Sequence, residues 1–435
     1  MPTELHVHVV QDPSRGFTTL PDRLTRGPDI TVCLDGVGED RIRARLYGPA
    51  VPQLYGTEHR VDLAVRPADV RDAAARLCRQ WKEHFVDHRP ADAPDSAYAT
   101  LVDLRTRPLV EVYDIVSELA LVGSELLYGT LLGGTDERVV RFRNYLTEAL
   151  RGQEGLRVRF DSDLYVPWPM VCLEEPGVPP LQRGGDPGPL FRRFLGYRHQ
   201  IEQTGGAYPW LAGLREAPEV PAVSLNHDVR VDRKGRTRAA EVAAVLAKGT
   251  RFVERRTHGE LVQALGRDDL CEQLMYFWCH GHFVPNGPRP ASLALTLTDN
   301  KTIDAQTVRD RRRRFGSESP FQPFVMLNAC HAGAPDGGGD HRFLSLALID
   351  AGARGVLGPQ IEMPQAFAAE YALEFLTRYL HGTETAGGIA HAVARHFADT
   401  LHNPLGFAYA LHHGMDTRLE RADAPTSDAG REVPV

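Results

Sequence analysis

A histidine and a cysteine fifty positions apart are the residues of this sequence best suited to catalysis. His280 is followed by Gly281 and ends the apolar run 274–279, and Cys330 ends a second apolar run, 323–329. A thiolate is a strong nucleophile, and a nearby imidazole lowers the pKa of the thiol and returns a proton to a leaving amine. The pair predicts a nucleophilic cysteine site in which the backbone N–H groups of Gly281 and Cys330 stabilise an oxyanion.

Both apolar runs have the length and continuity of strands that are buried on both faces. The segment 285–315 between them contains a turn-rich loop, a strand-like stretch at 292–298 and an arginine-rich stretch at 302–315 that is suited to a surface helix. This crossover is long enough to bring the chain back to a parallel neighbouring strand. Open α/β sheets place their sites where such strands end, so we expect His280 and Cys330 to meet at that edge.

A single cysteine or histidine after an apolar run is usually a packed core residue, so the alternative to catalysis is a structural role. The conjunction of strand, His-Gly, crossover, strand and Ala-Cys favours catalysis. Cys279 precedes His280 and should point to the opposite face, into the core. The spacing contains no Cys-x-x-Cys or His-x-x-x-His pair, so we predict no metal. A zinc site here would have to use the five neighbouring histidines and cysteines, which are Cys279, His280, His282, Cys330 and His331.

These residues resemble the motifs of a known family. His280-Gly281 after a buried strand, and Asn-Ala-Cys-His-Ala-Gly at 328–333, are similar to the motifs of the CHAT domain, a bacterial relative of caspases, metacaspases and separase. The similarity in the order of elements covers roughly residues 110–418. It implies a caspase-like α/β sandwich with a mainly parallel central sheet flanked by helices. It also implies a cysteine endopeptidase without a cofactor that cleaves a protein substrate in regulated bacterial defence or cell death.

The same resemblance indicates a pocket for the substrate residue before the scissile bond. Metacaspases carry an acidic residue two positions before the cysteine, where it pairs with a basic substrate side chain. This sequence has Asn328 there, and an amide does not offset the desolvation of a buried cation as a carboxylate does. Glu362, after the next strand, and Asp161, after an earlier strand, are the candidate substitutes, although each is also suited to a solvated position. We expect a basic preference only if Glu362 or Asp161 reaches the pocket, and a neutral preference otherwise.

The first hundred residues lie outside the resemblance. Residues 1–88 predict a small α+β module with strands and one amphipathic helix that begins at Pro67, and we expect it to act as a sensor or a docking site for a regulatory partner. The remaining divisions are a proline-rich linker at 89–97, a helical entry segment at 98–155, the caspase-like peptidase domain at 156–418 and a disordered tail at 419–435. The predicted strands of the first module lie at 5–9, 30–34, 41–47 and 60–65.

Composition excludes several classes of protein. The net charge of −7 gives no reason to expect nucleic acid as a partner. Six scattered cysteines form no disulfide framework, which indicates a reducing compartment. We find no secretory signal at the start and no apolar run of about 18 residues, so we expect a cytoplasmic protein with no membrane partner.

Two other functions remain open at this point. The first is a non-catalytic interaction module with the same fold, in which His280 and Cys330 never align. The second is a cysteine-dependent acyl hydrolase or transferase that acts on a small molecule.

Overall fold

The computed structural model of the chain describes ten segments. The predicted strand at 5–9, most of the linker 89–97 and most of the tail 419–435 lie outside them. The described segments are 27–52, 59–90, 97–164, 166–174, 186–205, 217–232, 234–286, 289–315, 319–331 and 342–422.

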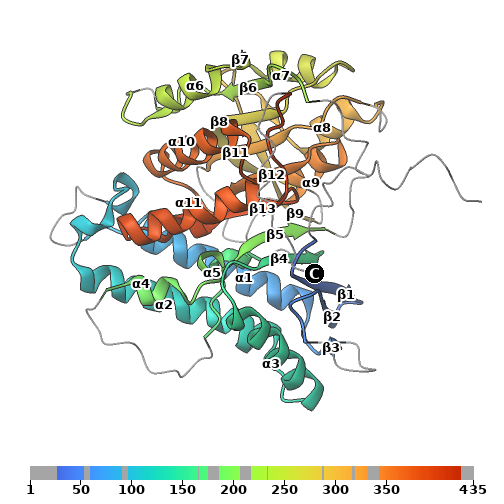
Figure 1. Ribbon diagram of the computed structural model, residues 1–435, viewed down its shortest axis with the longest axis vertical. Coiled ribbons are helices and arrows are strands. Elements are labelled where there is room, and N and C mark those ends of the chain that lie inside the picture. The colour runs from blue at the N-terminus through green and yellow to red at the C-terminus, as the bar shows by residue number, and fades with distance from the viewer. Residues whose placement is uncertain are drawn as a thin grey trace, which may run out of the picture.

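The described residues form one mixed sheet with helices on both sides (Figure 1). The strands are β1 Ile30–Val37, β2 Arg41–Tyr47, β3 His59–Leu63, β4 Arg157–Ser162, β5 Gln200–Thr204, β6 Ala222–His227, β7 Arg251–Arg255, β8 Leu274–Asn286, β9 Arg289–Thr296, β10 Thr302–Ile303, β11 Phe324–His331, β12 Gly355–Pro359 and β13 Tyr409–His412. The α-helices are α1 Pro67–Phe85, α2 Leu109–Ser124, α3 Glu137–Gly152, α4 Gly188–Phe191, α5 Leu195–Arg198, α6 Ala239–Ala247, α7 His258–Leu265, α8 Ala305–Arg312, α9 Arg342–Asp350, α10 Gln365–His381 and α11 Ala386–Leu401. Short helical turns complete the set: η1 Tyr98–Thr100, η2 Leu104–Thr106, the π-helical η3 Glu125–Leu131, η4 Trp168–Met170 and η5 Pro404–Ala408.

The sheet has thirteen described strands, and its main path is β10-β9-β8-β11-β12-β13-β5-β4-β1-β2-β3. The strand β8 also pairs with β6 along its first half, and β6 pairs with β7. Seven of the twelve pairings are parallel. The predicted α/β fold with a mainly parallel central sheet is therefore confirmed.

The parallel strands form two blocks that run in opposite directions. β7, β6, β8, β11 and β12 run one way, and β13, β5, β4 and β1 run the other way. The blocks meet at the antiparallel pair β12–β13, where Pro359 pairs with Tyr409. The carboxyl ends of the two blocks therefore lie at opposite edges of the sheet.

Each face of the sheet has its own core, because alternate residues of a strand point to opposite faces. In β8, Tyr276 and Trp278 belong to the larger core, which includes buried side chains of α1, α2, α3, α6, α10 and α11. Phe277 and Cys279 belong to the smaller core, beneath α7, α8 and α9. Burial of each such side chain contributes about 1.5–3 kcal/mol, so the strand is held from both sides.

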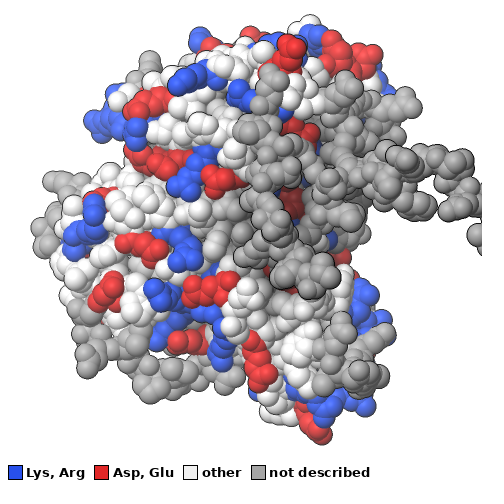
Figure 2. Space-filling view, viewed as in Figure 1, with Lys and Arg blue, Asp and Glu red and all other residues white. Residues whose placement is uncertain are grey.

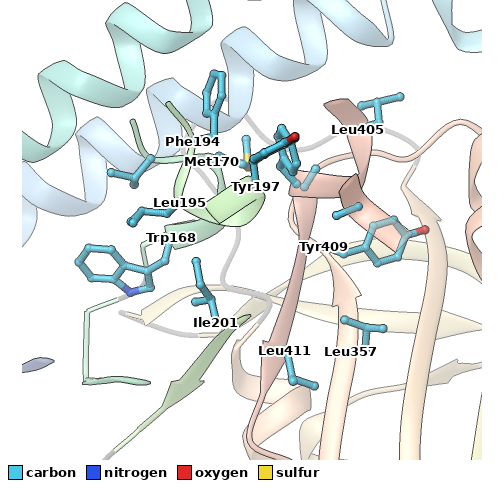
Figure 3. Close-up of a cluster of buried hydrophobic side chains, with 14 of the residues drawn as sticks. Trp168, Met170, Phe194, Leu195, Tyr197, Ile201, Leu357, Leu405, Tyr409 and Leu411 are labelled. Carbon is cyan, nitrogen blue, oxygen red and sulfur yellow. The ribbon is translucent and has the colours of Figure 1, made fainter. Parts of the chain in front are cut away.

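The larger core joins early and late parts of the chain. Figure 3 shows Trp168, Tyr197 and Ile201, from the segment before β6, close to Leu357 and Leu411 of the last two strands. All five side chains are at least nine-tenths buried. The segment before β6 therefore packs as part of the same body as the strands after it.

The first module predicted from the sequence shares this sheet and this core. β1 pairs in parallel with β4, with Val32 opposite Phe160. The helix α1 starts at Pro67, as predicted, and buries Trp81 against Phe194 and Phe407 of the larger core. The strands β1, β2 and β3 thus extend one edge of the central sheet (Figure 1).

Some local expectations differ from the structure. The apolar stretch 110–132 predicts one long helix, whereas the structure has the α-helix α2 followed by the π-helical turn η3. Asp35-Gly36 is a turn signal in the sequence, but it falls inside β1, and the chain instead turns at Gly38, whose positive φ suits glycine. The stretch 405–411 predicts a last strand, and this strand begins only at Tyr409 because η5 precedes it.

The described surface shows mixed charge. On the face in Figure 2, Lys and Arg side chains alternate with Asp and Glu. Among the described helices, none has the length and unbroken apolar character needed to cross a lipid bilayer.

Candidate active site

The strands β8 and β11 place His280 and Cys330 side by side. They pair in parallel from Leu274 and Phe324 onward, and in this register the partner of Cys330 is His280. Neighbouring strands lie about 4.8 Å apart, so the two backbone positions are adjacent, at the carboxyl end of β11 and midway along the longer β8, where the parallel pairing ends. The parallel pairing predicted for the two apolar runs is confirmed.

His280 emerges where β8 extends beyond β6. The pairing of β6 with β8 ends at His227 and Trp278, and from His280 onward β8 pairs with β9 on that side. Tyr276 and Trp278, on the same face of β8, are buried in the larger core, whereas the His280 side chain is 40% exposed. The imidazole therefore leaves the core at a place that a substrate can reach.

A buried carboxylate that the sequence analysis did not single out lies beside this imidazole. Asp228 follows β6, its side chain is 0% exposed, and its Oδ2 lies 4.0 Å from Nε2 of His280. Its backbone N–H donates to the carbonyl oxygen of Trp278 at 2.9 Å, which fixes it to β8. Parallel strands that end at one edge bring together the residues that follow them. The stretch 221–225 predicts such a strand, and Asp228 follows it, so the sequence contains a signal for this residue as it does for His280 and Cys330.

Arg230 holds the Asp228 carboxylate from the other side. The backbone N–H of Arg230 donates to Oδ1 at 2.9 Å, and its Nη2 donates to Oδ2 at 2.6 Å. Burial alone would raise the pKa of the Asp228 carboxyl, but the hydrogen bonds and charge of Arg230 outweigh burial and hold that pKa below its usual range. The ring of His280 therefore faces an ionised carboxylate at neutral pH.

Asn328 is buried in a hydrogen-bond network. It is 1% exposed, and its Nδ2 donates to the Tyr276 hydroxyl at 3.2 Å and to the Ala368 carbonyl at 2.9 Å. Its Oδ1 accepts a hydrogen bond from the Tyr409 hydroxyl at 2.7 Å. These contacts tie β11 to β8, β13 and α10 two residues before Cys330. The pocket role of Asn328 stays a prediction, and it concerns an amide whose N–H groups and oxygen are all engaged in this buried network.

Glu362 lies three residues beyond β12, at the same edge of the sheet as Cys330. Its carboxylate is 3.4 Å from Nζ of Lys82 in α1, and each of these side chains is 28% exposed. Lys82 also binds Asp87 at 3.0 Å. Burial raises the pKa of Glu362, and the charge of Lys82 partly opposes this. A carboxylate is thus present at the edge where we predicted one, but α1 supplies its cation.

Asp161 lies at the other edge of the sheet. It pairs with Thr204 of β5, whose hydroxyl donates to the Asp161 carboxylate at 2.9 Å. The block that contains β4 runs against β11, and β12, β13 and β5 separate the two strands. The prediction that Asp161 lines the pocket beside Cys330 is corrected for this reason.

Gly281 lies inside the sheet and not at its rim. Its register partners are His331 on β11 and Leu295 on β9, so a strand flanks it on each side. The N–H of a strand residue lies in the plane of the sheet and points to a neighbour, and its use for an oxyanion requires local opening of this ladder. The oxyanion role of Gly281 stays a prediction.

Cys279 and His282, which are close to His280 in the sequence, have other surroundings in the structure. Cys279 is completely buried in the smaller core, on the opposite face from His280, as alternation requires. The imidazole Nδ1 of His282 is 3.1 Å from the Thr296 hydroxyl of β9. Within the part of the chain that the structure describes, no group of three His, Cys, Asp or Glu side chains is arranged to hold a metal ion.

Comparison with known proteins identifies the segment that carries this site. Residues 232–407 match the family model of the CHAT domain, and the match contains His280 and Cys330. The family recognised from the sequence is confirmed for this segment, which is shorter than the predicted range 110–418. A probable protease of Vitiosangium sp. (strain GDMCC 1.1324) is 27% identical over 136 residues, which are 31% of this chain and 17% of that protein.

Two crystal structures of the Saccharomyces cerevisiae separase–securin complex are also similar to the chain. Their TM-scores are 0.41 and 0.43, with 8% and 10% sequence identity. Each alignment covers 88% of this chain and 30% of the solved chain. The chain thus spans less than a third of the length of each of these solved chains.

Proposed function

We propose that this chain, whose residues 232–407 match the CHAT domain, is a cysteine endopeptidase with Cys330 as nucleophile and His280 as its acid–base partner. The observation that carries the proposal is the register of β8 and β11, which makes the two residues direct partners at the carboxyl edge of parallel strands. The partial similarity to a probable protease agrees with this assignment.

The proposed reaction has two stages. The thiolate of Cys330 attacks the scissile carbonyl carbon, the C–N bond breaks, and the imidazolium of His280 gives its proton to the departing amine. This leaves a thioester on Cys330 and a neutral imidazole. The imidazole then removes a proton from water, and the resulting hydroxide attacks the thioester. The C–S bond breaks, which restores the thiolate–imidazolium pair and releases a peptide carboxylic acid that loses its proton to solvent. No other reactant is needed.

The biological setting is proposed from the family resemblance. We place the protein in the cytoplasm, in a regulated bacterial defence or cell-death system, with another protein as substrate. A regulatory partner would bind through residues 1–88. This part of the proposal is an analogy at the level of the family.

The test uses a peptide with an electrophilic group in place of the scissile bond, with mass spectrometry to locate the label. We expect label on Cys330 and cleavage of a fluorogenic peptide library by the wild type. Cys330→Ala and His280→Ala should each lower cleavage by about a thousandfold while thermal melting is unchanged. Cleavage that survives in Cys330→Ala would remove the assignment.

Two other cysteines serve as controls. Cys279→Ala removes a thiol from the opposite face and should leave the labelling of Cys330 unchanged. Cys271 is exposed, so its labelling measures non-selective reaction. Equal labelling of Cys271 and Cys330, with no peptide cleaved, would favour the interaction module. Preference for a small acyl electrophile over every peptide would favour the small-molecule acyl hydrolase or transferase.

A further inference from the structure

The Asp228 carboxylate lies beside His280 but has no role in the mechanism proposed above for His280 and Cys330. It is completely buried and its Oδ2 lies 4.0 Å from Nε2 of His280. We infer that Asp228 is a positioning residue, which holds the Nε2–H of His280 and stabilises the imidazolium of that residue. This inference rests on the proposed function, because it concerns the same site.

The geometry assigns different tasks to the two nitrogens of the ring. Nε2 is the nitrogen directed at Asp228, so a carboxylate there favours a proton on Nε2. Nδ1 is then the free base that accepts the thiol proton and later donates it to the amine. The separation of 4.0 Å is longer than a hydrogen bond. Catalytic contacts of this kind are often long in unliganded proteins and shorten when substrate binds.

A local structural role accounts for only part of the arrangement around Asp228. Oδ1 accepts the backbone N–H and the Nε of Arg230, at 2.9 Å and 2.8 Å, which closes the turn after β6. Oδ2 accepts Nη2 and Nε of Arg230, at 2.6 Å and 3.1 Å, and also lies 4.0 Å from Nε2 of His280. Arg230 thus engages both oxygens, but Oδ2 is the one that also faces the imidazole, a contact that the turn does not require.

Arg230 is itself fixed, so it can hold the carboxylate in place. Its Nη2 donates to the carbonyl oxygen of Leu297 at 3.2 Å, and its Nη1 donates to Asn300. These contacts connect the turn after β6 to the segment after β9. Asp228 is therefore anchored from the side away from His280, which is the requirement for a group that orients another.

The first test replaces Asp228 with asparagine, which keeps the size and one acceptor but removes the charge. We expect Asp228→Asn to lower kcat/KM for library peptides by about a hundredfold, mainly through kcat. The alkaline limb of the pH profile should move to lower pH, because the imidazolium loses a neighbouring negative charge. Among the described residues, the neighbouring charged or titratable groups Arg230, Asp299 and His282 are unchanged in this variant.

Arg230→Gln is a second variant, for which we expect the alkaline limb of the pH profile to shift in the opposite direction. Loss of a positive charge next to Asp228 should move the alkaline limb to higher pH, with a smaller decrease in kcat. Glu254→Gln is the matched control, because it removes a carboxylate of the neighbouring strand that is 2.6 Å from His227. It should leave the profile in place. Opposite displacements in the first two variants support a positioning role.

The outcomes separate this inference from the proposed function. If the wild type cleaves peptides but the alkaline limb stays in place in both Asp228→Asn and Arg230→Gln, the positioning role is overturned and the dyad stands. If Asp228→Asn does not fold, the direction in which Arg230→Gln shifts the alkaline limb of the pH profile decides the question. If the wild type cleaves no peptide and Cys330 takes no label, the proposed function fails and this inference fails with it.

Discussion

At the scale of single residues, Asn328 shows how a position that resembles a family motif can have another use. Metacaspases carry an acidic residue there, whereas this amide connects three hydrogen-bond partners within the core. A carboxylate cannot donate to the Ala368 carbonyl, so the same position cannot satisfy both roles in this fold. The network lies directly before Cys330 in β11, and we regard it as a support for this proposed nucleophile.

We expect Asn328→Asp to destabilise the protein without creating a basic preference. The change removes both N–H donors and places a charge among buried groups, which should lower the free energy of unfolding by about 3 kcal/mol. Urea denaturation measures this, and a peptide library measures the preference. Asn144→Asp, the same change at an exposed position of α3, should alter stability by less than about 0.5 kcal/mol. A gain of cleavage after arginine at unchanged stability would show that position 328 lines the pocket.

At the scale of elements, the local sequence pattern predicts where the strands lie. Pairing between segments far apart in the sequence determines the direction in which each strand runs. The apolar runs that became β8 and β11, and the crossover between them, carry enough signal for parallel pairing. The reversal between β12 and β13 depends on contacts between segments far apart in sequence, which no local pattern contains. Because of this reversal, β4 ends at the edge of the sheet opposite to the edge that carries Cys330, and Asp161 lies there. Asp228 was within reach of sequence reasoning, because the strand that it follows had been predicted.

A contact between two elements leads to a prediction about substrate preference. The α1 residue Lys82 pairs with Glu362, the candidate pocket carboxylate at the edge of Cys330. We therefore expect the wild type to prefer an uncharged residue before the scissile bond. In Lys82→Met the carboxylate loses its cation, and cleavage after arginine should rise by about tenfold, as a peptide library measures.

Two further variants make this prediction specific. Addition of Glu362→Gln to Lys82→Met should abolish the gain, because no carboxylate remains. Arg79→Met removes a positive charge from an exposed position of the same helix and should leave the preference unchanged. A preference for arginine already present in the wild type, and retained in Glu362→Gln, would mean that another group forms the pocket.

At the scale of the whole molecule, the segment before the CHAT match is part of the body that holds the site. The sheet continues from β10 to β3 without a break in hydrogen bonding. The helix α1 contributes Trp81 to the larger core and Lys82 to Glu362, so it connects that core to the edge that carries Cys330. The predicted sensor or docking role of residues 1–88 stays a prediction, and it concerns a segment that also completes the fold.

Deletion of residues 1–88 tests this organisation. The deletion exposes the β4 edge that β1 covers and removes Trp81 from its contacts with Phe194 and Phe407. Loss of one buried tryptophan side chain costs about 3–5 kcal/mol, and typical domains have only about 5–15 kcal/mol in total. We expect the shortened chain to be insoluble or to lack a cooperative thermal transition, as measured by circular dichroism. Deletion of residues 1–26 keeps β1 and α1, and should preserve the transition. A shortened chain that melts cooperatively at the wild-type temperature and still labels at Cys330 would show that residues 1–88 are a separable module.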